Sequence, residues 1–102
     1  MFEWEISTKD YLRLRAHGTP HRLVDVRTIP EFNGAHVNGA EFITLSKFAA
    51  EFPEKLPSKN EKIILYCAHG ERSMMATEML RTAGYTDAWS LAGGYETLKT
   101  EL

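Results

Sequence analysis

The feature that most constrains the fold of this chain is a regular alternation between short apolar runs and segments with helical or turn character. The runs RLVDV, AEFIT, KIILY and DAWSL are rich in β-branched, aromatic and other apolar residues. Alternation of this kind with short connections is typical of an α/β domain built on a mostly parallel sheet. Together with a half-exposed edge strand near the N-terminus, the runs predict a sheet of about five strands.

Individual elements follow from periodicity and from capping residues. Strands are expected at 2–6, 22–26, 40–44, 62–66 and 87–91. Helices are expected at 7–17, at 46–52 with Pro53 as the terminator, at 73–83 with Gly84 as the cap, and at the C-terminus with Tyr95, Leu98 and Leu102 on one side. The segment TIPEFNGAHVNG is rich in turn residues and is interpreted as a loop.

Composition narrows the classes of protein that this chain can represent. Its 102 residues, 43% of them hydrophobic, fit one domain spanning 1–102. The 12 basic and 14 acidic residues form no basic block, so neither nucleic acid nor a membrane surface is expected as a partner. The first ten residues do not resemble a secretory signal, and no apolar run approaches the roughly 20 residues that span a bilayer. A cytoplasmic location is therefore expected.

The single cysteine, Cys67, directly follows the most apolar run and precedes a segment of helical periodicity. One cysteine excludes an internal disulfide, and the scattered histidines have no recognisable zinc spacing, so no metal site is expected. A loop between a strand and a helix N-terminus favours anions, and there a cysteine favours its reactive thiolate form. A cysteine after an apolar strand is equally often an inert core residue.

The residues around Cys67 help to choose between these interpretations. Gly70 lets the loop curl tightly, and Arg72 would stabilise a nearby anion. His69 is either a solvated loop residue or a substrate contact, whereas Glu71 is interpreted as solvated because its charge would oppose that of a thiolate. Asp25 and Arg27 follow another predicted strand, so they are expected at the same edge of the sheet.

The spacing of the loop separates two kinds of cysteine chemistry. Cysteine phosphatases and arsenate reductases place five residues between the cysteine and an arginine, which forms a cradle for a tetrahedral oxyanion. Here four residues separate Cys67 from Arg72, and Ser73 stands where that arginine would be. The loop is one residue too short for a phosphatase, which is retained only as a minor alternative.

Three motifs in order resemble those of the rhodanese family of sulfurtransferases: LVDVRTIPEFNGAHVNGAEFITL, CAHGERS and LAGGYETL. The resemblance implies a rhodanese-like three-layer α/β/α domain that uses no metal or organic cofactor. It also implies that Cys67 is the catalytic nucleophile and carries sulfur as a persulfide. The loop that binds the substrate and the persulfide would then consist of Ala68, His69, Gly70, Glu71, Arg72 and Ser73.

The implied reaction is a double displacement with ping-pong kinetics, as in a thiosulfate sulfurtransferase. A donor such as thiosulfate or a small persulfide gives sulfur to Cys67, and cyanide, a small thiol or a protein thiol removes it. Asp25 and Arg27 are expected to support the floor of the loop, with a possible link to Arg72. Gly93 and Gly94 are expected to form a turn with close backbone approach, and His36 to be packed and hydrogen-bonded.

Two departures from the family pattern bear on function. Many members that use thiosulfate have a basic residue after the cysteine, where this chain has Ala68, so the physiological donor stays open. Leu98 stands where the family usually has tryptophan, which affects packing more than chemistry. The alternative function is a sulfur-relay or protein-interaction module without turnover of small donors.

Overall fold

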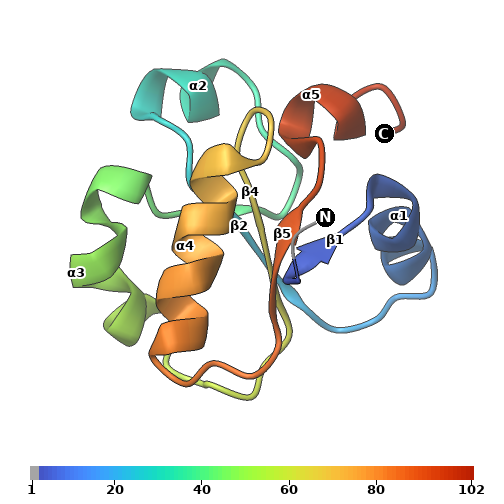
Figure 1. The fold of residues 1–102 in the computed structure, drawn as a ribbon. Helices are drawn as coiled ribbons and strands as arrows, with labels where there is room; N and C mark the ends of the chain where they lie inside the picture. The colour runs from blue at the N-terminus through green and yellow to red at the C-terminus, as the bar shows by residue number, and fades with distance from the viewer. Residues whose placement is uncertain (1–2) are drawn as a thin grey trace.

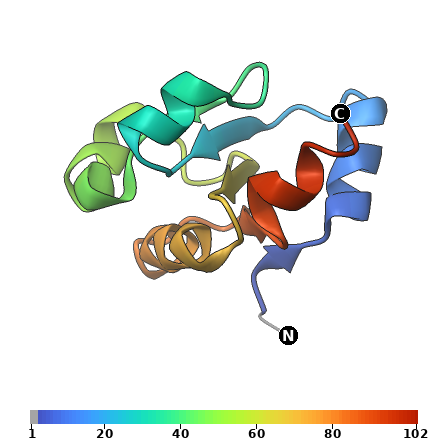
Figure 2. The same cartoon turned by 90° about the horizontal axis from the view of Figure 1, so that it is seen from above.

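A computed structural model of the chain, which describes residues 3–102, contains one parallel sheet with helices on both faces (Figures 1 and 2). The strands are β1 (Glu5–Ile6), β2 (Arg22–Asp25), β3 (Glu41–Phe42), β4 (Ile63–Tyr66) and β5 (Ala88–Leu91). The helices are α1 (Thr8–Ala16), α2 (Ile29–Gly34), α3 (Leu45–Lys55), α4 (Glu71–Thr82) and α5 (Gly94–Leu98). The predicted α/β class and the parallel five-stranded sheet are confirmed, with strand order β1-β5-β4-β2-β3.

Strand β4 lies at the centre of the sheet, and all four of its residues are buried. Because side chains alternate along a strand, Ile63 and Leu65 pack toward α3 and α4, whereas Ile64 and Tyr66 pack toward α1 and α5. The same alternation places Cys67, the next residue in the row of Ile63 and Leu65, in the core on the α4 side. The position of Cys67 therefore follows from the register of β4.

The chain reverses its direction of travel across the sheet between β2 and β4. After β2 it moves outward to β3 at one edge, and after β4 it moves to β5 on the way to the other edge. In open α/β sheets, ligands bind beyond the carboxyl ends of the strands at such a reversal. The segment after β2 and the loop after β4 meet there, at the top of Figure 1 between α2 and α5.

Three local expectations were wrong. The turn-rich segment contains α2, which begins with a capping box in which Glu31 N donates to Thr28 Oγ1 and Thr28 N donates to Glu31 Oε1. Pro53 does not end α3, which continues to Lys55. Helix α5 ends at Leu98, and Leu102 is 59% exposed instead of lying on its packed side.

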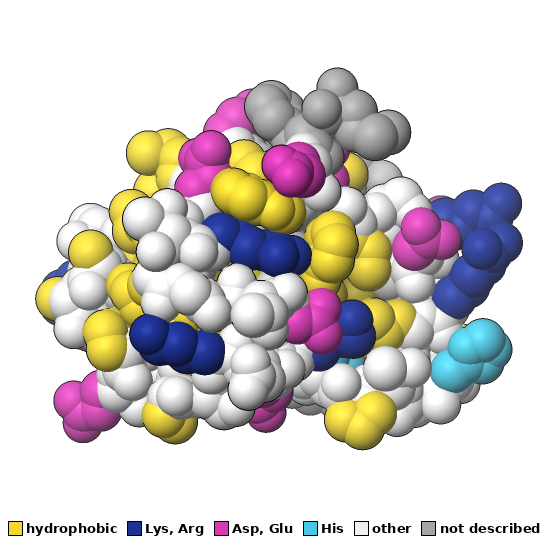
Figure 3. All heavy atoms as spheres, turned by 60° about the horizontal axis from the view of Figure 1, so that its bottom comes forward, with side chains coloured by type: hydrophobic (Ala, Val, Ile, Leu, Met, Phe, Trp, Pro, Cys, Tyr) yellow, Lys and Arg dark blue, Asp and Glu magenta, His cyan; other side chains and the backbone are white. Residues whose placement is uncertain are grey.

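The other elements lie close to their predicted positions, with shifts at their ends. Helix α4 begins at Glu71, two residues earlier than expected, so Arg72 and Ser73 belong to its first turn. Position 2 of the first expected strand lies outside the described residues, and β1 is an edge strand as predicted. Figure 3 shows acidic and basic side chains interspersed on one face of the molecule. Within residues 3–102, every helix is too short or too polar to cross a bilayer.

The Gly93–Gly94 turn approaches the cysteine loop more closely than any side chain would allow. A Cβ atom on Gly94 would lie 2.5 Å from Ala68 O and 2.6 Å from Cys67 O, and the φ angle of Gly94 is +61°. The expectation of a turn with close backbone approach is confirmed. Because these neighbours are backbone atoms, they cannot move aside as a flexible side chain would.

Replacement of this glycine should be unusually destabilising. We expect Gly94→Ala to lower the free energy of unfolding by about 3 kcal/mol or more, because the methyl group overlaps the loop backbone. Gly18→Ala is a matched control, since Gly18 has φ +67° but no atom within 4 Å of its added Cβ. It should cost only about 1–2 kcal/mol, the penalty of the left-handed backbone conformation. If urea denaturation showed the same loss of unfolding free energy for Gly94→Ala and Gly18→Ala, the steric overlap at position 94 would be contradicted.

Candidate active site

The only cysteine lies at the carboxyl end of the central strand, in the loop that enters α4. Cys67 is 0% exposed and packs in the same cluster as Ala76 and Leu80 of α4. Its sulfur nevertheless has polar neighbours: Gly70 N donates a hydrogen bond to Sγ at 3.0 Å, and Ser73 Oγ lies 3.6 Å from Sγ. The sulfur is thus buried, but a backbone amide and a hydroxyl face it.

The backbone of the loop orients that amide toward the sulfur. Gly70 immediately precedes α4 with a φ angle of +121°, which only glycine adopts without strain. Gly70, the N-cap residue of α4, has no side chain that could bond the free amides of the first turn, and this end of a helix carries partial positive charge. The combination would stabilise negative charge on the Cys67 sulfur.

A buried pair of serine hydroxyls lies behind the sulfur. Ser73 Oγ is 2.8 Å from Ser90 Oγ and donates to Gly70 O at 3.1 Å, and both serines are 0% exposed. Ser90 comes from β5 and was not among the predicted site residues. The sequence offered one indication of Ser90, namely a serine within the apolar run DAWSL. A serine buried there needs a hydrogen-bond partner, which Ser73 provides.

The other end of the loop is fixed by the N-terminus of α5. Tyr95 N donates to Cys67 O at 2.8 Å, and Glu96 N donates to Ala68 O at 3.1 Å. These bonds satisfy two carbonyl groups at the point where the chain leaves β4. They also explain the close approach of Gly94, which precedes both donors.

Arg72 forms a two-pronged ion pair with Glu31 of α2. Its Nη1 lies 2.8 Å from Glu31 Oε1, and its Nη2 lies 3.1 Å from Oε2. The hydrogen bonds from Arg72, with that from Thr28 N, lower the pKa of Glu31 to about 2. The same bonds, followed by smaller contributions from Cys67, raise the pKa of Arg72. Glu31 was not among the predicted site residues, although it matches the first of the three motifs that resemble the rhodanese family.

Asp25 and Arg27 form a buried ion pair under the site, but they do not contact Arg72 as the sequence suggested. Arg27 Nη2 lies 2.8 Å from Asp25 Oδ2 and donates to Ala35 O at 2.6 Å. Burial alone would lower the pKa of Arg27, but the bonds to Asp25 outweigh it and raise the pKa. The guanidinium also lies 4.5 Å from the Tyr95 ring centre. Asp25 and Arg27 therefore support the loop through α5.

The remaining residues of the expected site lie on its rim. His69 and Glu71 are exposed, and Ala68 is half-buried. His36 is hydrogen-bonded as expected, because its Nδ1 lies 2.9 Å from Phe32 O and its ring stacks on Phe32 at 3.7 Å. Its side chain is nonetheless exposed.

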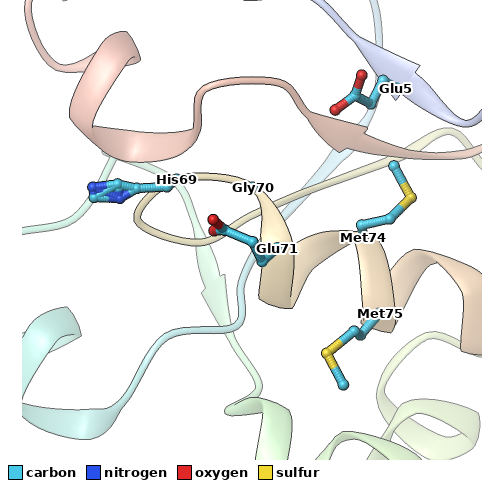
Figure 4. A pocket seen from close by; sticks show the side chains of 6 residues that line it. All are labelled: Glu5, His69, Gly70, Glu71, Met74 and Met75. Atoms are coloured by element: carbon cyan, nitrogen blue, oxygen red, sulfur yellow. The ribbon is translucent and has the colours of Figure 1, made fainter. Parts of the chain in front are cut away.

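A pocket of about 380 Å³ opens beside the loop (Figure 4). Gly70 forms part of its wall, and the amide of this residue is bonded to the Cys67 sulfur. The other lining residues come from β1, the loop and α4: Glu5, His69, Glu71, Met74 and Met75. The pocket is thus linked to the cysteine through Gly70, whereas Cys67 itself does not line it.

These features define a class: parallel α/β domains with a cysteine in a short loop between a central strand and a helix N-terminus. The family model for the rhodanese-like domain matches residues 7–101, and the chain belongs to that family. The suspected resemblance is confirmed.

Two sulfurtransferases are similar to this chain in sequence. The chain is 32% identical over 77 residues to the thiosulfate sulfurtransferase GlpE of Tolumonas auensis, which covers 72% of this chain and 68% of the relative. It is 29% identical over 96 residues to the adenylyltransferase and sulfurtransferase MOCS3-1 of Zea mays, covering 89% of this chain but only 20% of the maize protein. The chain thus spans about a fifth of the length of that relative.

Solved structures have the same fold over almost the whole chain. The human single-domain sulfurtransferase TSTD1 matches with a TM-score of 0.80 and 27% identity, covering 98% of this chain and 97% of TSTD1. The rhodanese-like domain of Alr3790 from Anabaena matches with a TM-score of 0.87 and 25% identity, covering 98% of this chain and 76% of that one. The expected rhodanese-like architecture is confirmed.

The pair of Glu31 and Arg72 predicts a pH dependence of stability. The folded-state pKa of Glu31, about 2, lies below its ordinary value of 4.5, so the stabilisation is complete above the ordinary value and is lost as pH falls toward 2. We expect Glu31→Gln to lower the free energy of unfolding by about 1 kcal/mol at neutral pH, because solvent screens the pair in part. The difference, measured by urea denaturation, should shrink between about pH 5 and pH 2.

A matched control tests whether the effect belongs to the ion pair. Glu54→Gln changes an exposed carboxylate of α3 and should give the same unfolding free energy as the wild type throughout this range. A Glu31→Gln deficit that stays constant down to pH 2 would show that the variant acts through the capping of α2 alone.

Proposed function

We propose that this protein is a sulfurtransferase that carries sulfane sulfur as a persulfide on Cys67. The observation that carries the proposal is the 3.0 Å hydrogen bond from Gly70 N to Cys67 Sγ at the start of α4, in a domain of the rhodanese-like family. Fixed donors aimed at a sulfur would stabilise the charge of a thiolate or a persulfide.

The proposed reaction has two displacement steps. In the first, the Cys67 thiolate attacks the outer sulfur of a donor such as thiosulfate; a new S–S bond forms, the donor S–S bond breaks, and sulfite leaves with the electron pair. In the second, a thiolate or cyanide attacks the outer sulfur of the persulfide, and the Cys67 thiolate is the leaving group. The net result is transfer of one sulfur atom, and the kinetics should be ping-pong.

The residues around the sulfur have separate roles in this proposal. Gly70 N donates to the sulfur and would stabilise its charge. The Ser73 hydroxyl accepts from the Cys67 thiol and donates to Gly70 O, and it would add a second donor to the thiolate by turning its proton toward Sγ. Ala68, His69, Glu71 and Arg72 form the rest of the loop that binds the substrate and the persulfide. Asp25 and Arg27 act as positioning residues through Tyr95 of α5.

The alternative is a sulfur-relay or protein-interaction module that exchanges sulfur with a protein thiol and turns over small donors only incidentally. The complete burial of Cys67 and the uncharged Ala68 beside it favour this alternative. Slow turnover of every small donor, with fast transfer from Cys67 to one protein thiol, would select it. The cytoplasmic location expected from the sequence stays a prediction.

The persulfide is directly measurable because the chain has one cysteine. Incubation with thiosulfate or with glutathione persulfide should add one sulfur atom, about 32 Da, to the intact protein by mass spectrometry. A thiol acceptor should remove that mass. Cys67→Ser should gain nothing, and either retention of the added mass by this variant or its absence from the wild type with all donors would reject the proposal.

The hydroxyl of Ser73 should matter for the rate of persulfide formation. We expect Ser73→Ala to slow this step about tenfold, because the hydroxyl, once turned from Gly70 O toward the thiolate, would contribute one hydrogen bond of about 1.4 kcal/mol. Thr77→Val is the matched control, because it removes a buried hydroxyl from the same helix that donates to Ser73 O instead. Single-turnover mass spectrometry should show a near wild-type rate for Thr77→Val, and equal slowing of both variants would refute a role at the sulfur.

A further inference from the structure

The pocket beside the cysteine loop has features that bear on which sulfur compounds reach Cys67. Gly70 forms part of its wall and donates a hydrogen bond to the sulfur, although Cys67 itself is buried and does not line the pocket. The charges of the pocket therefore act on molecules that approach the cysteine loop from this side. In Figure 4 the Met74 side chain extends from α4 toward β1, the strand that carries Glu5. Residues far apart in the sequence therefore share this small space.

The charge of the pocket is negative. Two of the six residues that line it, Glu5 and Glu71, are carboxylates, and none of the six is a lysine or an arginine. The nearby loop cation, Arg72, is held by both oxygens of Glu31, and Lys99 at the C-terminal end of α5 is held by Glu96 at 2.6 Å. Both cations are thus largely neutralised by carboxylate partners.

Besides His69 and Gly70, the remaining wall of the pocket consists of the apolar, polarisable side chains of Met74 and Met75. Met74 is nearly buried, whereas Met75 is 51% exposed at the rim. Thioether side chains adapt to aliphatic groups of different shape. The pocket therefore combines a surface for a short alkyl chain with negative charge, next to a buried sulfur.

We propose that this pocket selects the substrates of Cys67 by charge, favouring thiols and persulfides that carry an ammonium or guanidinium group and disfavouring anionic donors such as thiosulfate. The inference rests on the proposed function for its sulfur substrates. A cation within a few bonds of the reacting sulfur is attracted to Glu5 and Glu71, whereas a dianion is repelled by both. Ala68 supplies no compensating charge.

Charged thiosulfonates test this selectivity without requiring a persulfide. The Cys67 thiolate attacks the sulfenyl sulfur of 2-aminoethyl or 2-sulfonatoethyl methanethiosulfonate, a mixed disulfide forms, and methanesulfinate leaves. Rates for each reagent are divided by its rate with 2-mercaptoethanol, which removes the intrinsic preference of any thiolate for cations. We expect the normalised ratio of cationic to anionic rates to be about tenfold or more at low salt and to fall in about 1 M salt.

Matched variants assign the effect to the pocket. Glu71→Gln and Glu5→Gln should each lower the ratio several-fold, whereas Glu54→Gln, an exposed carboxylate on α3, should leave it unchanged. Glu31→Gln should raise the rate with the anionic reagent, because it leaves the charge of Arg72 uncompensated. A normalised ratio near one, or a ratio that Glu71→Gln and Glu5→Gln do not change, overturns the inference.

Acceptors of matched size extend the test to sulfur transfer. From preloaded Cys67 persulfide, cysteamine should remove sulfur faster than 3-mercaptopropionate at equal thiolate concentration, with 2-mercaptoethanol between them. If the persulfide transfers sulfur to the three thiols at rates that do not follow this order, the charge selectivity is wrong and the proposed function still stands. If the cationic thiosulfonate reacts faster but no donor yields a Cys67 persulfide, access to Cys67 is selective by charge, and the proposed sulfurtransferase function is wrong.

Discussion

The geometry of the candidate site depends on the backbone contact between the cysteine loop and the start of α5. Strand β4 delivers Cys67 to the edge of the sheet, but its direction beyond that point is fixed by the bonds from Tyr95 N and Glu96 N. Only a glycine at position 94 lets the two segments come this close. Because Arg27 stacks against Tyr95, the buried pair with Asp25 reinforces the same contact from below.

Two kinds of charge act at the site: partial charges of the backbone close to the sulfur, and formal charges of side chains farther from it. The partial charges of Gly70 N and of the start of α4 act on the sulfur at short range. The formal charges lie farther from the sulfur, at the pocket. Because Arg72 is paired with Glu31, the net charge there is set by the carboxylates that line the pocket. A site that stabilises a small anion at its centre can therefore repel larger anions at its entrance.

The sequence predicted the parallel sheet and the place of Cys67 because both depend on local patterns: apolar runs, their alternation and a glycine before a helix. It missed α2, since the turn propensity of Asn33 and Gly34 concealed the capping box of Thr28 and Glu31. The pairing of Glu31 with Arg72 was beyond its reach, because it joins side chains 41 residues apart. Pro53 was a wrong terminator for a simpler reason. Proline has no N–H to donate to the carbonyl four residues back, but Pro53 lies only two residues before Lys55, so the lost bond falls in the last turn of α3.

The place of Cys67 in the core cluster links the chemical state of the sulfur to the packing of the whole domain. Its neighbours include Ala76 and Leu80, which hold α4 against the sheet. Interiors this densely packed respond to the addition of one atom, so each covalent form of the sulfur corresponds to a different fit between α4 and β4. The melting temperature of the protein would therefore report the occupancy of its single cysteine.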